Sequence, residues 1–303
     1  MIDIFIPSYH RPQKIKTANY FIKNGWPPNK VHVIIDNEAD DREEYKAVAN
    51  KKGFHLHVFN IEDARQKYDF IHRPSVSRRA AGMSRNMFYE YAGKKGIDFY
   101  CVIDDDTNNY QIRPFQRYIR KANYADINYF FESIKEIMIK HKIGLFGISQ
   151  TGDAFEKINK KLLRSKVMNT TFYYTPYIYW GERGVQNDDT SQFATVLNEG
   201  YFTGSLASGI YLNQTQSATQ EGGLTDLYRE NKLLNKALVP PIQFPSAICA
   251  NRQKRNGGRL HHKIQYRYLM PKLMKGKRNN IAWDTYPEDV PFSNLFPREN
   301  HVQ

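Results

Sequence analysis

The chain has 303 residues, of which 41% are hydrophobic, 14% aromatic and 25% charged. This balance is typical of a globular protein with a core large enough to fold without disulfides, and it excludes collagen, a coiled coil and a disordered linker. Forty-four Lys and Arg residues against 31 Asp and Glu residues leave a formal net charge of +13, which favours an anionic partner.

The expected compartment follows from hydropathy and cysteine usage. No apolar stretch approaches the roughly 18 residues that span a bilayer, and the first residues lack the features of a signal peptide. Cys101 and Cys249 stand in unrelated contexts, which argues against a disulfide framework and a CxxC metal site. We therefore expect a cytoplasmic protein without a membrane span.

The first half of the chain alternates between strand-like and helix-like segments. Short β-branched and aromatic runs predict strands, and apolar residues three or four apart predict the helices between them. Such alternation predicts an α/β fold with a mostly parallel sheet and helices on both faces, which binds ligands at the carboxyl ends of its strands. The predicted strands are 2–7, 31–35, 54–59, 99–103 and 143–148, and the predicted helices lie around 15–22, 45–49, 80–91 and 127–138.

The second half is less regular. Residues 172–180 are aromatic and strand-prone, and residues 188–198 predict a helix. Prolines, among them Pro240 and Pro241, indicate loops in the final third. Between Arg252 and Arg278 there are ten basic residues and no acidic one, so most of the net charge belongs to this basic block.

Three adjacent carboxylates follow the strand predicted at 99–103. Asp104, Asp105 and Asp106 in the segment YCVIDDDT repel one another unless cations neutralise them. Alternation in an extended chain would place Asp104 and Asp106 on one side, where they could hold Mg²⁺ or Mn²⁺ together with diphosphate oxygens. A solvated acidic turn or a helix N-cap is the alternative.

Polar residues near the ends of other predicted elements form a second group of candidates. Arg85, in the helical segment SRNMF, carries a guanidinium that can bind phosphate with two hydrogen bonds, and Asn86 lies beside it. Ser8 and Arg11 follow the first strand, and Asp36 ends the second. The alternatives are an exposed helix arginine and ordinary turns.

Taken in this order, the motifs IxIPSYxRP, Asp36, SRN and VIDDD resemble the GT-A glycosyltransferases of the family-2 kind over roughly residues 1–201. The resemblance implies a GT-A (Rossmann-like) fold, a UDP-sugar donor and a Mn²⁺ or Mg²⁺ ion. It implies that Asp104 and Asp106 hold the metal, and that the donor is bound by Pro7, Ser8, Arg11, Asp36, Arg85, Asn86, Asp104 and Asp105.

The acidic pair of that family, which begins an acceptor-side helix, resembles Asp188 and Asp189 here. Transfer to a hydroxyl needs a base within hydrogen-bond reach of the attacking oxygen. The family usually has Glu-Asp at this place, with the second residue as base, so the resemblance favours Asp189 and leaves Asp188 to hold the loop or another hydroxyl. A plain helix N-cap is the alternative.

Two further features are candidates for an acceptor pocket and for a third metal ligand. Trp180 and Gly181 precede the acidic pair and are expected at an acceptor pocket or in the core. His262, or its neighbour His261, is a candidate third metal ligand, since related enzymes sometimes draw a histidine from their C-terminal part. A surface or phosphate-binding histidine is the competing interpretation in so basic a stretch.

The basic block favours a nucleic-acid partner, because Lys and Arg bind phosphates while Tyr266 and Tyr268 could stack on a base. A solvated face or contact with an anionic membrane is the alternative. The whole chain is similar to the TET-associated glycosyltransferases of bacteriophages, which modify hydroxymethylated pyrimidines in DNA. The expected DNA-binding residues are Arg252, Lys254, Arg255, Arg259, Lys263 and Arg267.

The expected function is metal-dependent sugar transfer from a UDP-sugar to a 5-hydroxymethylpyrimidine in DNA, with 5-hydroxymethylcytosine favoured. Residues 1–225 would form the catalytic domain, and 226–303 a basic C-terminal extension packed on it. Inversion follows from a direct displacement, with retention left open. The alternatives are a polysaccharide or lipid-linked glycan glycosyltransferase, a non-catalytic nucleic-acid binder and a nucleotidyltransferase. The oligomeric state is not predicted.

Overall fold

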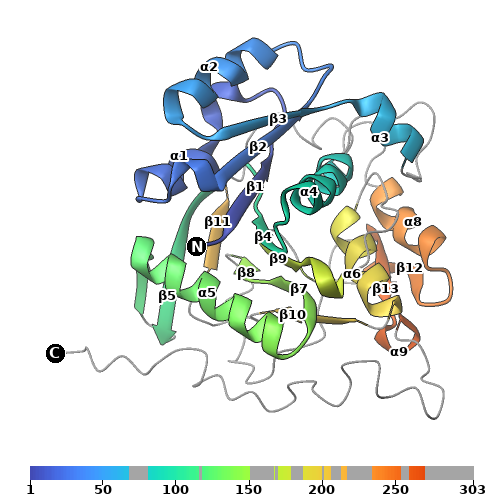
Figure 1. The fold of residues 1–303 in the computed structure, drawn as a ribbon. Helices are drawn as coiled ribbons and strands as arrows, with labels where there is room; N and C mark the ends of the chain where they lie inside the picture. Colours follow the sequence, from blue (N-terminus) through green and yellow to red (C-terminus); the bar gives the residue numbers. More distant parts are fainter. Residues whose placement is uncertain are drawn as a thin grey trace.

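The central element of the protein is a seven-stranded sheet with helices on both faces (Figure 1). In the computed structural model, the described residues are 1–67, 81–115, 118–150, 167, 170–178, 187–199, 201–205, 213–216, 234–253 and 259–269. The strand order is β10-β7-β9-β4-β1-β2-β3. The strands are β1 (Asp3–Pro7), β2 (Val31–Asp36), β3 (His55–Phe59), β4 (Phe99–Val102), β7 (Ile143–Gly147), β9 (Thr171–Tyr174) and β10 (Phe202–Ser205).

The sheet is mostly parallel. β1 pairs in parallel with β2 and β4, β2 with β3, and β7 with β10. Only β9, among these seven strands, is antiparallel to its neighbours β4 and β7. The predicted α/β class with a mostly parallel sheet is confirmed, and the five predicted strands correspond to β1, β2, β3, β4 and β7. Because parallel strands end at the same edge of a sheet, the segments that follow β1, β2 and β4 lie close together at the carboxyl edge.

Alternation along the strands divides the core into two layers. On β1, Ile4 and Ile6 belong to one apolar cluster, and Phe5 between them belongs to the other. α1 (Lys16–Lys23), α2 (Arg42–Lys52) and α5 (Tyr124–Lys140) pack on the first side. α3 (Ile61–Lys67), α4 (Ala81–Lys95) and α6 (Asp188–Asn198) pack on the second. The helices predicted around 15–22, 45–49, 80–91, 127–138 and 188–198 are α1, α2, α4, α5 and α6.

A smaller sheet was not predicted from the sequence. Its strand order is β6-β5-β11-β8, and β5 begins directly after the acidic motif. β5 pairs with β6 and β11, so it leaves the central sheet. The motif therefore lies where the chain passes from one sheet to the other. The bounds are β5 (Thr107–Phe115), β6 (Tyr118–Lys121), β8 (Ser149–Gln150) and β11 (Asn213–Gln216).

The described C-terminal segments pack beside α6. Ala247, Ile248 and Leu269 are buried in the same apolar cluster as Phe193 of α6. This packing supports an extension that shares the core of the main domain, while the boundary at residue 225 stays a prediction. The elements are α8 (Leu234–Gln243), the hairpin of β12 (Ile248–Gln253) and β13 (Arg259–Ile264), and α9 (Tyr266–Leu269).

The prediction that Pro240 and Pro241 lie in loops is wrong. Both lie inside α8, in its last turn. The carbonyl of Pro240 still accepts a hydrogen bond from the Phe244 N–H at 2.9 Å, and Ala237 and Val239 are buried. Packing of the helix therefore outweighs the hydrogen bonds that proline cannot donate. In the part of the chain that the structure describes, no helix has the length and hydropathy to cross a membrane.

A chain of polar side chains joins the starts of β1, β2 and β3. Asp3 Oδ1 lies 3.0 Å from His32 Nε2, and His32 Nδ1 lies 3.1 Å from His57 Nε2. Burial, together with the nearby His32 and His55, lowers the pKa of His57 to about 4. Burial also lowers the pKa of His32, against the opposing effect of Asp3. The folded protein therefore holds neutral imidazoles at this edge.

This arrangement predicts a loss of stability in mild acid. A histidine whose pKa is lowered by folding binds more protons in the unfolded state, so its stabilising effect is present above pH 6.5 and is lost as the pH falls toward 4. We expect the melting temperature to fall across this window, and to fall less in a His57→Gln variant. Calorimetric melting curves between pH 7.5 and 4.5 test this, and equal slopes for both proteins would contradict it.

Candidate active site

The acidic motif forms a turn. Asp105 and Asp106 lie in the turn between β4 and β5, so the prediction of an extended chain across the acidic motif is wrong, while a shared metal-binding role of Asp104 and Asp106 stays a prediction. The reason is topological, because the chain must change direction to enter the second sheet. Thr17 of α1 holds this turn: its hydroxyl donates to the Asp104 carbonyl and accepts from the Thr107 N–H at 3.0 Å.

Asp105 binds the loop that follows β1. Its Oδ2 accepts a hydrogen bond from Ser8 Oγ at 2.8 Å, and its Oδ1 lies 2.7 Å from Arg11 Nη1. Burial raises the pKa of Asp105 to about 6, although Arg11 and Ser8 lower it. Three residues proposed for the donor thus meet at the carboxyl edge. Pro7 ends β1, and Asp36 ends β2, where its Oδ1 accepts from the Glu38 N–H at 3.0 Å.

Arg85 joins the acidic turn to α6. One guanidinium nitrogen lies 2.7 Å from Asp104 Oδ1, and another contacts Asp188 Oδ2. Burial lowers the pKa of this guanidinium, but Asp188 and Asp104 outweigh it and raise the pKa well above its usual value. Arg85 was expected near a diphosphate, and here its charge is balanced by two carboxylates. Asn86 is fully buried beside it, so no surface of Asn86 is open to a ligand.

Asp106 has the features of a cation ligand. Its Oδ1 is buried without a hydrogen-bond partner among the described residues. Burial, together with the neighbouring Asp104, raises the pKa of Asp106 to about 6. A buried carboxylate oxygen without a donor is costly unless a cation compensates it. Oxygen ligands suit Mg²⁺ and Mn²⁺, so the carboxylates of this turn fit a hard divalent ion.

His262 lies at the start of α6 instead of joining the acidic turn. Its ring nitrogens are 3.4 Å from Asn187 Nδ2 and 3.5 Å from Thr190 Oγ1, and the residue is 8% exposed. Among the described residues, Asp104, Asp106 and His262 do not bring their ligand atoms within 4.8 Å of one another. The predicted role of His262 as a metal ligand therefore has no geometric support, and its contacts fasten the β12–β13 hairpin to α6.

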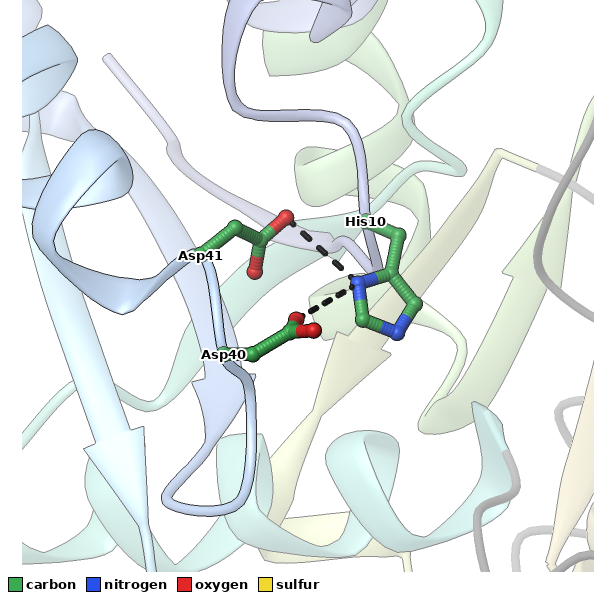
Figure 2. Close-up of side chains that lie close together, drawn as sticks. All are labelled: His10, Asp40 and Asp41. Atoms are coloured by element: carbon green, nitrogen blue, oxygen red, sulfur yellow. Dashed lines mark ion pairs between the residues drawn. The ribbon is translucent and has the colours of Figure 1, made fainter.

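One group of described residues does bring three such atoms together, namely His10, Asp40 and Asp41 (Figure 2). His10 Nδ1 lies 3.1 Å from Asp40 Oδ1 and 3.6 Å from Asp41 Oδ2. The Asp40 side chain is 83% exposed. These contacts of the imidazole with two carboxylates tether the loop after β1 to the turn before α2.

The two carboxylates that begin α6 have different surroundings. Asp188 is 4% exposed and pairs with Arg85, whereas Asp189 is half-buried and its Oδ1 accepts from the Thr190 N–H at 2.8 Å. A carboxylate held by a buried guanidinium is poorly placed to take a proton from a substrate. The geometry therefore favours Asp189 over Asp188 as a base.

The basic residues do not form one face of the hairpin. Lys263 pairs with Cys249, and the buried His262 pairs with Ala250, so alternation places Lys263 on the face opposite His262. Arg252 is exposed, but its register places it with His262. Arg267 of α9 is exposed and lies 4.5 Å from the Tyr268 ring centroid. Arg259 begins β13, while Lys254, Arg255, Trp180 and Gly181 lie outside the described residues.

Sequence reasoning missed two residues of the site. Thr17 of α1 binds the acidic turn, and Tyr45 of α2 binds the loop after β1. Tyr45 fits the apolar spacing of α2, and Thr17 is an ordinary residue of α1. No sequence signal separates them from core residues, because their partners lie 34 to 90 positions away.

Comparison with known proteins finds solved structures that are distantly similar to this chain, and one family model that matches it. No curated protein matches. A crystal structure of glucosyl-3-phosphoglycerate synthase from Mycobacterium tuberculosis, in complex with Mn²⁺, UDP and glucosyl-3-phosphoglycerate, is similar at 10% identity and a TM-score of 0.45 over 87% of this chain and 86% of that one. The structure of the same enzyme with Mn²⁺, UDP-glucose and phosphoglyceric acid is similar at 12% identity and a TM-score of 0.45, over 87% of this chain and 86% of that one.

A third structure, mannose-1-phosphate geranyltransferase from Thermus thermophilus, gives 12% identity and a TM-score of 0.29 over 80% of this chain and 66% of that one. Likenesses this distant carry no conclusion about substrate. The decisive match is to a family model, that of the TET-Associated Glycosyltransferases, which covers residues 2–223. This confirms the resemblance drawn from the motifs: the chain belongs to the TET-Associated Glycosyltransferase family.

Proposed function

We propose that this glycosyltransferase moves a sugar from a UDP-sugar to the hydroxyl of a 5-hydroxymethylpyrimidine in DNA, with 5-hydroxymethylcytosine as the favoured base. Family membership supports sugar transfer. The observation that carries the site assignment is the Arg85 bridge, which brings Asp104 and Asp188 within reach of one guanidinium. The donor-side turn and the helix that begins with the candidate base are therefore neighbours.

The donor would lie along the carboxyl edge of β1, β2 and β4. Ser8 and Arg11 offer a hydroxyl and a guanidinium next to the acidic turn, and Asp36 ends the adjacent strand. Asp106, whose buried Oδ1 lacks a hydrogen-bond partner among the described residues, and Asp104 would hold Mn²⁺ or Mg²⁺. When bound, such an ion supplies positive charge next to the diphosphate that leaves.

The acceptor would approach the N-terminus of α6. Asp189 would accept the proton of the attacking hydroxyl as its oxygen forms a bond to the anomeric carbon. The bond between that carbon and the diphosphate oxygen breaks, and the electron pair leaves with UDP. A direct displacement of this kind inverts the anomeric centre. Asp188, neutralised by Arg85, holds the start of the helix in place.

DNA contact is proposed for the surface formed by Lys263, Tyr266, Arg267 and Tyr268. All four residues are exposed, and no acidic residue lies among them. Cationic groups bind phosphates and exposed tyrosines can stack on bases. Tyr266 packs against Phe193 of α6, with ring centroids 5.8 Å apart, so this surface adjoins α6. A hydroxymethyl group at C5 of a pyrimidine lies in the major groove, where it is accessible without base flipping.

A charge-reversal variant tests this surface. Replacing Lys263 and Arg267 together by glutamate should weaken DNA binding and reduce the slope of log K against log salt by about 0.9 for each phosphate that the variant no longer neutralises. Fluorescence anisotropy with a DNA duplex at several salt concentrations measures both quantities. The control reverses Lys23 and Lys140, two exposed lysines on the opposite helical layer, and so changes the net charge equally. Equal slopes for the two variants would move DNA binding elsewhere.

The function itself is tested by product analysis. The protein is incubated with Mn²⁺, a panel of nucleotide sugars, and DNA containing cytosine, 5-hydroxymethylcytosine or 5-hydroxymethyluracil, and the DNA is digested to nucleosides for mass spectrometry. A hexose-sized mass increase on a hydroxymethylated nucleoside, with release of UDP, is expected. Release of pyrophosphate would indicate a nucleotidyltransferase instead. Transfer to a glycan but to no DNA would overturn the proposed acceptor.

A further inference from the structure

We infer that Tyr45 is a positioning residue of the donor site, whose hydroxyl holds the loop after β1 in the shape in which Ser8 and Arg11 reach Asp105. The inference rests on the proposed function, because it takes this loop as part of the donor site. Tyr45 belongs to α2 and is fully buried. It therefore cannot touch a substrate and acts through the loop.

The hydrogen bonds around this hydroxyl have a defined direction. Ser8 Oγ donates its proton to Asp105 Oδ2 at 2.8 Å, so Ser8 can only accept from Tyr45 Oη, 2.8 Å away. The Arg11 N–H donates to Tyr45 Oη at 3.0 Å. The Tyr45 hydroxyl thus donates once and accepts once. Because burial raises the pKa of Tyr45 well above its usual value, the proton that it donates stays in place.

The same loop is tethered to the start of α2 at a second point. His10, between Ser8 and Arg11, has a φ of 52° and reaches Asp40 and Asp41 in the turn before the helix (Figure 2). That tether is exposed, whereas Tyr45 fixes the loop from inside the core. A rigid, buried ring holds its hydroxyl at one place, so the positions of Ser8 Oγ and the Arg11 backbone follow from the packing of α2 against the sheet.

Removal of this hydroxyl should change donor affinity more than catalysis. Phenylalanine keeps the ring and its packing but leaves the Arg11 N–H without its acceptor and Ser8 without its donor. The loop can then depart from the shape that presents the Arg11 guanidinium and the Ser8 hydroxyl. The proton is taken at the start of α6, which packs on the opposite layer of the core from α2, so the chemical step should keep its rate once the donor is bound.

The test compares Tyr45→Phe with Tyr20→Phe. The Tyr20 hydroxyl also makes two hydrogen bonds between distant parts of the fold, to the Ala122 carbonyl at 3.2 Å and from the Tyr110 N–H at 3.4 Å, and neither partner belongs to the donor loop. Calorimetric titration with UDP and Mn²⁺ gives Kd, steady-state transfer gives KM and kcat, and melting curves give stability for both variants and the wild type.

We expect Tyr45→Phe to raise the Kd of UDP and the KM of the UDP-sugar by about three- to tenfold, as for one lost hydrogen bond, with kcat little changed. Tyr20→Phe should lower the melting temperature without changing Kd. Ser8→Ala provides a second variant, and combining it with Tyr45→Phe should raise Kd less than the product of the single effects.

The possible failures are distinguishable. A wild-type protein that binds neither UDP nor another nucleoside diphosphate overturns the proposed function and this inference with it. A wild type that binds UDP, with a Tyr45→Phe variant that binds it equally well, overturns the inference alone. Equal rises in Kd for Tyr45→Phe and Tyr20→Phe would show a general loss of stability. A fall in kcat at unchanged Kd would place Tyr45 in the chemical step. Either result would contradict a positioning role.

Discussion

Replacement of Asp189 by asparagine is expected to lower kcat for sugar transfer by about 10²- to 10⁴-fold, the range associated with loss of a general base. Asparagine keeps the size of the side chain and an oxygen that can accept from the Thr190 N–H, so the start of α6 should remain folded. It cannot take the proton of the attacking hydroxyl. UDP-sugar affinity should be unchanged, because the residues that bind the donor lie on the strand edge.

Transfer rates at saturating donor, together with the Kd of UDP, check this expectation. Glu199→Gln is the matched control, since it removes one carboxylate at the opposite end of the same helix. It should retain the wild-type rate. An Asp189→Asn variant that transfers sugar at the wild-type rate would assign the base elsewhere. Equal losses in kcat and donor affinity would instead indicate that the variant disturbs the donor site.

Replacement of Asp106 by asparagine is expected to weaken binding of Mn²⁺ by at least about 100-fold. Loss of a residue that only supports a metal ligand costs up to about 100-fold in affinity, and loss of a direct ligand should cost no less. The Oδ1 atom of Asp106 is a buried carboxylate oxygen that lacks a hydrogen-bond partner among the described residues, as Asp41 Oδ1 in the His10 cluster also does. An amide has no charge to offer a cation in its place. Donor turnover should fall with the metal affinity and recover in part at high Mn²⁺. Titration of Mn²⁺ by electron paramagnetic resonance measures the affinity directly.

The control for this second variant is Asp40→Asn, because it neutralises one member of the His10 cluster, the one described group with three ligand atoms close together. We expect Asp40→Asn to bind Mn²⁺ as tightly as the wild type. The opposite result, with affinity lost in Asp40→Asn and kept in Asp106→Asn, would place the ion at the loop after β1. Loss in neither variant would refute both positions.

Several parts of this protein could be predicted from local sequence patterns. Short apolar runs and helical spacing identified β1, β2, β3, β4 and β7 and the helices between them, because burial on both faces of a parallel sheet leaves a near-continuous hydrophobic signal. The helix at 188–198 was predicted with the bounds of α6. The position of the acidic motif at the end of β4 followed from the same reasoning.

The misses share one cause. Local pattern suggested an extended chain at Asp104 to Asp106, but strand pairing in a second sheet requires a turn there. It suggested loops at Pro240 and Pro241, but both residues lie in α8, which packs beside α6. The resemblance to related enzymes suggested His262 as a third metal ligand, whereas hairpin register directs its ring to Asn187 and Thr190. In each case a long-range contact outweighed a local preference.

The sequence by itself determined the class of fold, the family motifs and the residue types available for chemistry, since these depend on neighbouring residues and on spacing. Only the tertiary structure decided which side chains neutralise one another. Arg85 lies between Asp104 and Asp188, and Tyr45 lies beneath Ser8, because helices far apart in the chain pack against the same sheet edge. Such pairings depend on distances in space, and these distances cannot be read from the spacing of residues along the chain.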